Sequence, residues 1–219
     1  MSLLWKKASY AEKYSKNYFF PDPDIRFFIK KLKISKKDFV GDFGCGDGAF
    51  LSAAAKKASF VFGVDMSSSQ LRAARKKMKS KNFKFFKRNF SDLANLPFFN
   101  KGFARKSLHH LKFSEKKKFF KKISEKMPKG SIFVIEDGIF FLFSRKELKK
   151  NWGNLMKDCR KYYGKEWEKK KKDVIYCFKK EYPCGLSEWR KALSAGGFVI
   201  KEAKKYSSFY GYMLAVKEK

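Results

Sequence analysis

The chain has 219 residues, a length typical of one domain with a substantial hydrophobic core. Lys and Arg interrupt every apolar run before it reaches the length of a membrane span, and the N-terminal MSLLWKKASY lacks the longer apolar core of a secretory signal peptide. The four cysteines form no C-x-x-C pair, which argues against a zinc or iron–sulfur site and predicts a reducing, cytoplasmic compartment.

The formal net charge of +32 raises the question of a nucleic-acid partner, because clustered Lys and Arg release counterions from phosphates. Of the 53 basic residues, 45 are Lys, and they are spread along the whole chain. Contacts that read or stack on bases favour Arg. We therefore favour a general compositional bias and keep RNA or DNA binding as the alternative.

Residues 1–37 predict one or two helices with a break at the turn sequence Pro21–Asp24. In the first of them Tyr10, Tyr14 and Tyr18 recur four residues apart, so the three rings share one face. A face of this kind is typical of an amphipathic helix that packs on a core.

The stretch Phe39–Phe50, FVGDFGCGDGAF, is the most informative part of the chain. An apolar strand leads into Asp42, then into Gly44, Gly46 and Gly48, and then into a helical run. Glycine supplies backbone angles that other residues avoid, and it lets a ligand approach the main chain. A strand that breaks at such glycines and restarts as a helix is typical of a nucleotide-binding turn.

A dinucleotide site is the first interpretation of this turn. Gly44, Gly46 and Ala49 fit the G-x-G-x-x-G/A pattern, and Asp65 stands where a ribose ligand belongs. Against it, the third glycine comes one residue early, and Asp42 would repel a pyrophosphate. The same carboxylate would attract a ligand with a cationic methionine end.

Beyond the turn, predicted strands and helices alternate. This spacing predicts a parallel sheet with helices on both faces, whose strand carboxyl ends form a ligand crevice along one edge. Residues 145–182 break the rhythm and predict a helical insertion. The predicted strands are 38–43, 60–64, 83–87, 103–108 and 131–136, and the predicted helices are 49–58, 67–80 and 114–126.

Taken together, six segments resemble the motifs of class I S-adenosylmethionine-dependent methyltransferases of the small-molecule type. The resemblance implies a single domain over residues 1–219 with an α/β, Rossmann-like fold. Its seven-stranded sheet is mostly parallel, with helices on both faces, an antiparallel last strand and the insertion between strands 5 and 6. The segments are Asp42–Gly48, Val61–Ser67, Asp92–Phe98, Ser107–Leu111, Met127–Asp137 and Ser187–Tyr206.

The resemblance implies S-adenosylmethionine as the cofactor, with S-adenosylhomocysteine as product, and gives the glycine turn a role in binding it. Gly44, Gly46 and Gly48 would pass the main chain under the ribose and methionine part. Asp42 would hold the methionine amino end. Cys45 lies inside the turn, where a small residue fits the tight backbone.

Asp65 and Asp92 are the acids implied to contact the nucleoside. Asp65 closes the second predicted strand and could accept both ribose hydroxyls, with Met66 against the adenine. The alternative for Asp65 is a cap of the helix that starts at Ser67. Asp92 and Leu93 match the family's adenine contact, through a carboxylate and a backbone N–H. The alternative for Asp92 is a turn residue.

The fourth strand departs from the family pattern, because Ala104 stands where an acid is expected. Ser107 and Leu108 are still implied to line the sulfonium end of the cofactor. His109 and His110, the only histidines, could act as a general base for a hydroxyl or thiol acceptor. The alternative is that they merely begin the next loop.

The leading hypothesis is a cytoplasmic methyltransferase that transfers a methyl group to a small-molecule acceptor by in-line displacement. The resemblance implies that the N-terminal helix, with Tyr10 and Tyr14, closes over the cofactor and that the insertion 145–182 covers the substrate. One alternative is an RNA methyltransferase that uses its basic surface to bind phosphates. A second alternative is a cofactor-binding protein without catalysis. We expect neither a membrane partner nor a bound metal.

Overall fold

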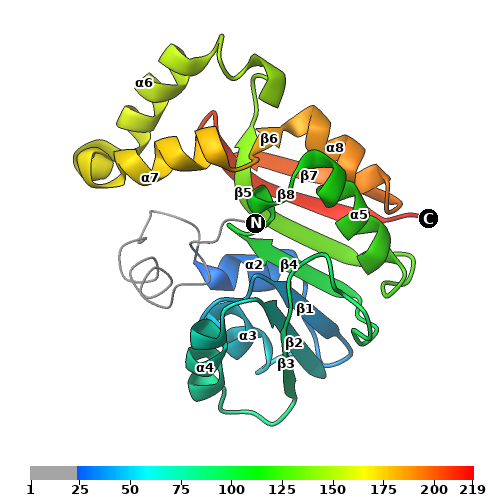
Figure 1. The fold of residues 1–219 in the computed structure, drawn as a ribbon. Helices are drawn as coiled ribbons and strands as arrows, with labels where there is room; N and C mark the ends of the chain where they lie inside the picture. Colours follow the sequence, from blue (N-terminus) through cyan, green and yellow to red (C-terminus); the bar gives the residue numbers. More distant parts are fainter. Residues whose placement is uncertain (1–23) are drawn as a thin grey trace.

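The computed structural model describes residues 24–219, and its centre is a mixed β-sheet (Figure 1). The strand order is β3-β2-β1-β4-β5-β8-β7, and a short strand, β6, pairs with the end of β5. The strands are β1 (Phe39–Phe43), β2 (Phe60–Asp65), β3 (Phe83–Lys87), β4 (Lys101–Arg105), β5 (Ile132–Phe140), β6 (Cys184–Gly185), β7 (Phe198–Lys205) and β8 (Tyr210–Lys217).

The directions of the strands bring several carboxyl ends to the same edge of the sheet. Strands β1 to β5 pair in parallel, whereas β8 runs antiparallel to both β5 and β7. The carboxyl ends of β1, β2, β4 and β5 therefore meet along one edge of the sheet. The predicted Rossmann-like fold, with its mostly parallel sheet and antiparallel last strand, is confirmed.

Helices cover both faces of this sheet (Figure 1). One face carries α2 (Ile25–Lys31), α3 (Ala49–Ala54) and α4 (Ser68–Lys77), and the other carries α5 (Phe113–Ser124) and α8 (Leu186–Ser194). Neighbouring residues of one strand enter opposite cores, as the pleat requires. Val61 joins the first core and Phe62 the second.

The second core is built largely from phenylalanine rings. Phe43 lies at its centre, with ring centroids 5.2 Å from Phe119 and 5.8 Å from Phe133. The Phe133 ring lies over Gly102 of the neighbouring strand, where a Cβ would come closer than 3.0 Å to the ring. Glycine therefore makes room for a ring that a side chain on β4 would displace.

The predicted insertion is present between β5 and β6. It consists of η3 (Arg145–Glu147), α6 (Trp152–Tyr163), η4 (Gly164–Glu166) and α7 (Trp167–Lys180). Its apolar side chains form a third cluster, which reaches Phe140 at the end of β5 and Tyr210 at the start of β8. This shared core fixes the insertion at the end of the central strands. Among the helices described, none combines the length and the apolar character that crossing a bilayer would require.

Two strands differ from their predicted bounds by more than one residue, for identifiable reasons. Strand β4 ends at Arg105, because Lys106 has a φ of 49° and the 3-10 helix η2 (Leu108–His110) follows. Strand β5 continues to Phe140, because its last residues pair with β8 and β6. The basic end of β4 also has a partner, since Arg105 forms an ion pair with the fully buried Glu136 of β5.

Candidate cofactor and active site

The glycine turn connects the carboxyl end of β1 to α3. Gly44, Gly46 and Gly48 have φ values of 80°, 51° and 74°, a region that favours glycine. The N–H of Gly44 donates to the carbonyl of Val64 at 2.8 Å, which fastens the turn to β2. The glycines permit this loop shape, and the hydrogen bond to β2 holds it in place.

The three glycines differ in what surrounds them. A Cβ on Gly44 would come closer than 3.0 Å to Ser107, and one on Gly48 would lie 2.8 Å from the Cβ of Ala74. A Cβ on Gly46 would meet only the side-chain oxygen of Gln70, at 3.8 Å. Packing within the chain explains the first two glycines. At Gly46 the main chain is open to a ligand.

Asp65 ends β2 with its carboxylate held by the main chain. One oxygen accepts a hydrogen bond from the Gly46 N–H at 2.9 Å, and the other accepts one from the Ser67 N–H at 2.8 Å. The cap of α4 is Ser67, whose side chain accepts from the Gln70 N–H. Burial raises the pKa of Asp65, against the lowering effect of these backbone donors. Each oxygen keeps a lone pair for a further donor, so the oriented carboxylate suits a diol.

Asp42 lies within β1, and only 3% of the residue is exposed. Burial and then the negative charge of Asp65 raise its pKa well above the ordinary range of a carboxyl group. The positive charge of Arg105 opposes this shift. A cationic ligand group beside Asp42 would stabilise its ionised form, which is what the methionine ammonium of the predicted cofactor offers.

The predicted adenine residues are less closely gathered. Met66 is half-buried next to Asp65. The side chain of Asp92 is 63% exposed and lies 3.9 Å from Arg88. The side chain of Leu93 packs into the core. The described residues do not bring Asp92 into a buried cradle with Asp65.

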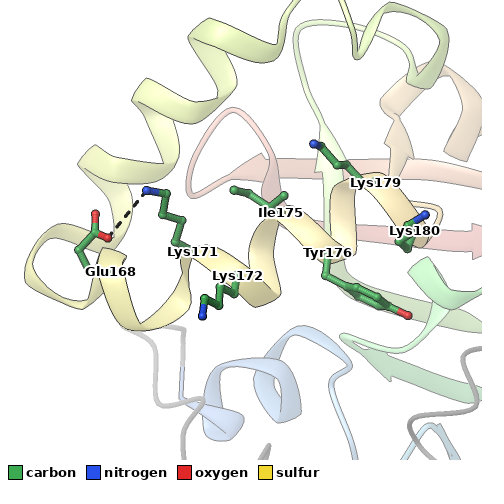
Figure 2. A pocket seen from close by; sticks show the side chains of 7 residues that line it. All are labelled: Glu168, Lys171, Lys172, Ile175, Tyr176, Lys179 and Lys180. Carbon is green, nitrogen blue, oxygen red and sulfur yellow. Dashed lines mark ion pairs between the residues drawn. The ribbon is translucent and has the colours of Figure 1, made fainter.

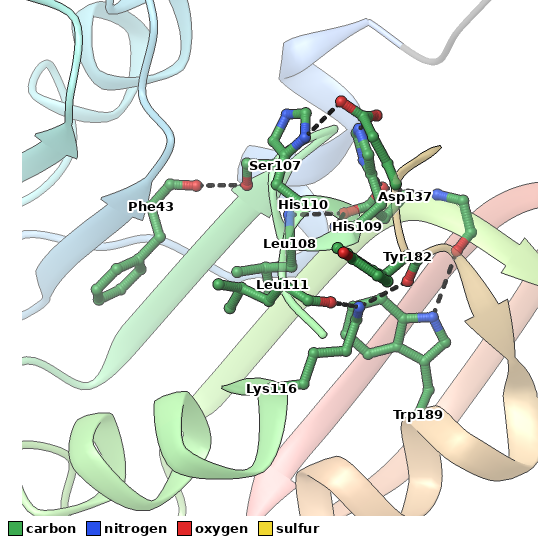
Figure 3. Close-up of polar contacts among 12 residues, drawn as sticks. Phe43, Ser107, Leu108, His109, His110, Leu111, Lys116, Asp137, Tyr182 and Trp189 are labelled. Carbon is green, nitrogen blue, oxygen red and sulfur yellow. Dashed lines mark hydrogen bonds and ion pairs between the residues drawn. The ribbon is translucent and has the colours of Figure 1, made fainter. Parts of the chain in front are cut away.

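Ser107 and Leu108 join the ends of three strands (Figure 3). The Ser107 hydroxyl donates to the Phe43 carbonyl at 2.7 Å, which ties β4 to β1. The N–H groups of Leu108 and His109 both donate to one oxygen of Asp137, at 2.9 and 3.0 Å, which ties η2 to β5. The predicted sulfonium end is thus a rigid junction at the carboxyl edge.

His109 and His110 form part of a buried network (Figure 3). The Nδ1 atom of His109 lies 2.5 Å from Asp137, and its Nε2 atom lies 3.2 Å from Glu181. The Nδ1 atom of His110 lies 3.0 Å from the other oxygen of Glu181. The two histidines therefore share a carboxylate that comes from the end of α7.

These contacts shift the ionisation of the network. Burial lowers the pKa of His109, but the charge and hydrogen bonds of Asp137 and Glu181 outweigh it and raise the pKa to about 10. Burial and the positive charge of His109 lower the pKa of His110. Burial raises the pKa of Asp137, but the charge and hydrogen bond of His109, together with the Gly138 N–H and the charge of Lys116, lower it further than burial raises it.

A buried lysine contacts the chain on either side of this network. Lys116 of α5 donates to the carbonyls of Leu111 and Tyr182, the second at 2.8 Å. The N–H of Tyr182 in turn donates to the His109 carbonyl at 2.7 Å. The chain that follows α7 is therefore joined to the chain that follows β4.

Sequence reasoning did not single out Asp137 or Glu181. For Asp137 a signal existed, since it follows an apolar run as Asp65 does and so stands at the carboxyl edge. For Glu181 there was none, because its role depends on where the insertion folds. Cys45 is buried in the core beside the turn. Tyr10 and Tyr14 lie outside the described residues.

A separate groove of about 490 Å³ runs along α7 (Figure 2). None of the residues that line it was predicted as a site residue. Its charge is positive, because four lysines face a single acid there. The lining residues are Glu168, Lys171, Lys172, Ile175, Tyr176, Lys179 and Lys180.

Comparisons with known proteins agree with this geometry. Residues 34–205 match a family model described as a methyltransferase domain. No protein of curated function shows a significant match in sequence.

Among solved structures, magnesium protoporphyrin IX methyltransferase from Synechocystis PCC 6803, with bound S-adenosylhomocysteine, is similar at a TM-score of 0.67 and 14% identity, covering 98% of this chain and 96% of that one. An S-adenosylmethionine-dependent methyltransferase from Mesorhizobium loti is similar at 0.63 and 14% identity, covering 89% and 99%. Geranyl diphosphate C-methyltransferase from Streptomyces coelicolor A3(2) is similar at 0.64 and 13% identity, covering 88% and 78%.

The structural likenesses show the fold, and the family model spans most of the chain. That family uses S-adenosylmethionine as its methyl donor. The glycine turn, Asp42 and Asp65 lie at the carboxyl ends of β1 and β2. The chain therefore belongs to the methyltransferase domain family and is a class I S-adenosylmethionine-dependent methyltransferase.

Proposed function

We propose that the chain methylates a small-molecule acceptor held between the carboxyl edge of the sheet and the insertion. The observation that carries this proposal is the docking of α7 on the donor edge. Tyr182 donates to the His109 carbonyl at 2.7 Å, and Lys116 holds the Tyr182 carbonyl at 2.8 Å. An acceptor at this edge would lie beside the end of α7, away from bulk water.

Two of the structural neighbours carry names that state a small-molecule acceptor. One is named for magnesium protoporphyrin IX and the other for geranyl diphosphate. These names describe those proteins, and they support a small-molecule acceptor here only as a class.

When bound, S-adenosylmethionine supplies a methyl group that its sulfonium has already activated. The residues of this chain have to align the donor with the acceptor and exclude water. We assign Asp65 to the ribose hydroxyls, Gly46 to the close approach of the main chain, and Asp42 to the methionine ammonium. Ser107 and Leu108 would then border the transferred methyl group.

A side-chain base is needed only where the acceptor keeps its proton at neutral pH. Both ring nitrogens of His109 face carboxylates, an arrangement that orients this ring. We therefore assign proton acceptance to His110 and a positioning role to His109. The variant His110→Gln should lower kcat while the affinity for S-adenosylmethionine stays unchanged.

Calorimetric titration with S-adenosylmethionine and S-adenosylhomocysteine tests the cofactor site. We expect micromolar affinity for the wild type and a loss of about tenfold or more, on the order of 1.4 kcal/mol, in Asp65→Ala. Asp92→Ala tests the adenine assignment separately. A folded wild type that binds neither ligand would overturn the site, and binding without turnover over a panel of hydroxyl and thiol acceptors would favour the non-catalytic alternative.

A second candidate function is the methylation of RNA, and the groove along α7 is the observation that favours it. Lys171, Lys172, Lys179 and Lys180 present four cationic side chains along one helix. Tyr176 lies among them and is partly exposed, as a base-stacking residue would be. We rank this function second, because the groove holds no arginine.

A further inference from the structure

Three potential metal ligands converge beside the donor edge. The ligand atoms of His109, Cys177 and Glu181 all lie within 4.8 Å of one another. Ligand atoms about 2.0–2.3 Å from a tetrahedral zinc ion are roughly 3.3–3.8 Å apart. The observed separation of 3.2 Å between His109 Nε2 and the Glu181 carboxylate is close to that spacing.

The backbone holds these ligands from two separate elements. Cys177 and Glu181 are four residues apart at the end of α7, so they lie one turn apart on the same face. His109 belongs to η2, which follows β4. The hydrogen bond from Tyr182 to the His109 carbonyl keeps the two elements in register. The cluster is thus formed by the fold and not by a single flexible loop.

The imidazole is also oriented as a metal ligand. Asp137 lies 2.5 Å from His109 Nδ1 and accepts from two backbone N–H groups of η2. A carboxylate on one ring nitrogen, with the metal on the other, is the usual surrounding of a zinc-bound histidine. On the opposite side, His110 Nδ1 lies 3.0 Å from the second oxygen of Glu181 and fixes that carboxylate.

We propose that His109, Cys177 and Glu181 bind a zinc ion that joins the end of α7 to the donor edge. The donor set contains one imidazole, one thiolate and one carboxylate. Zinc accepts all three, whereas magnesium and calcium take oxygen ligands almost alone.

Three protein ligands leave one tetrahedral position for water or for an acceptor oxygen or sulfur. The use of that position by an acceptor rests on the proposed methyl transfer, whereas the metal site itself does not. This site departs from our expectation of no bound metal, which rested on the absence of a C-x-x-C pair. Its ligands are of mixed type, and His109 and Cys177 are 68 residues apart in the chain.

Titration of the chelator-treated protein with Co²⁺ tests the site without reference to activity. We expect one Co²⁺ per chain, with a thiolate-to-cobalt charge-transfer band in the near ultraviolet that Zn²⁺ abolishes by displacement. Cys177→Ser should lose the band, and Glu181→Gln should weaken zinc binding. Cys159→Ser is the matched control, because that thiol is buried in the same insertion but lies outside the cluster.

A second-sphere variant adds a further readout. Asp137→Asn should lower the affinity for zinc by about 10–100-fold, as measured in competition with a chromophoric chelator. Circular dichroism and thermal unfolding establish that each variant is folded. A wild type that binds neither Co²⁺ nor Zn²⁺ stoichiometrically, or a folded Cys177→Ser that keeps the band, would overturn the proposal. Calorimetry with S-adenosylmethionine on the same samples separates this failure from a failure of the cofactor site.

Discussion

Among single residues, Asp42 places a carboxylate inside the sheet where its burial is costly. The pKa of Asp42 is higher in the folded chain than in the unfolded chain, so the folded chain holds this proton up to a higher pH. The ionised form therefore lowers stability, and this loss grows as pH rises through the raised pKa. The same charge suits a cationic ligand, so stability and binding oppose each other here.

Asp42→Asn should therefore raise Tm at neutral pH and weaken the binding of S-adenosylmethionine. Each kcal/mol added to the free energy of unfolding raises Tm by about 2–4 °C for a chain of this size. The advantage in Tm should shrink as pH is lowered, because the wild-type carboxyl group then becomes neutral. Calorimetry of unfolding over a series of pH values, with ligand titrations beside it, checks both effects. A variant that is less stable than the wild type at every pH would contradict the assignment.

Gly46 and Gly44 offer a matched pair for testing whether the turn serves a ligand or only the fold. At Gly46 a Cβ would make only an ordinary contact with Gln70, so Gly46→Ala should lose only the roughly 1–2 kcal/mol that a left-handed alanine costs. At Gly44 a Cβ would strike Ser107, and Gly44→Ala should be destabilised further. We expect folded Gly46→Ala to bind the cofactor poorly. Unchanged binding would show that no ligand approaches this main chain.

Among elements, the contact of β4 with β5 depends on a glycine that packs under a ring. Gly102→Ala should lower stability by about 1–3 kcal/mol, since overpacking forces Phe133 or the strand to move. Gly153, in the first turn of α6, has nothing within 4 Å of its Cβ position. Gly153→Ala should raise stability by about 0.4–1 kcal/mol, because it reduces the entropy of the unfolded chain. Denaturant titration checks both, and equal effects would contradict this packing.

The elements also show what sequence could predict. The passage from β1 through the turn to α3 was predictable, because its glycines and apolar run are local signals. The end of β5 was not, because Ile139 pairs with Cys184 from beyond the insertion. The end of β4 was equally unpredictable, because Lys106 adopts a positive φ, which is uncommon for lysine.

For the whole molecule, the charge of +32 predicts salt-sensitive binding to RNA without sequence preference. Replacing the four groove lysines by Ala should reduce the dependence of log K on log[salt] by about 0.7 for each lost phosphate contact. The matched control replaces Lys36, Lys37, Lys56 and Lys57, which are exposed elsewhere. We expect the two sets of variants to lose the same amount of salt dependence, as a general compositional bias toward lysine requires. A loss confined to the groove set would favour the RNA methyltransferase.

The whole fold followed from the sequence because strand, turn and helix signals repeat in a family order. The places of Asp42, Gly46 and Asp65 followed too, since they stand at the ends of recognisable strands, whereas their contacts with the cofactor stay a prediction. The network around His109 did not, because Asp137 and Glu181 reach it from β5 and from the insertion. Such convergence is set by tertiary packing, which has no counterpart in residue spacing.

The ring of Phe133 over Gly102 has a consequence for how this chain can change over generations. Neither position can drift alone, since a side chain on the strand excludes the ring and a smaller ring leaves a void. Replacement of one becomes acceptable only after replacement of the other, so the two sites should vary as a pair among descendants. Such coupled sites make a core rich in aromatic rings slower to diversify than one built from aliphatic side chains.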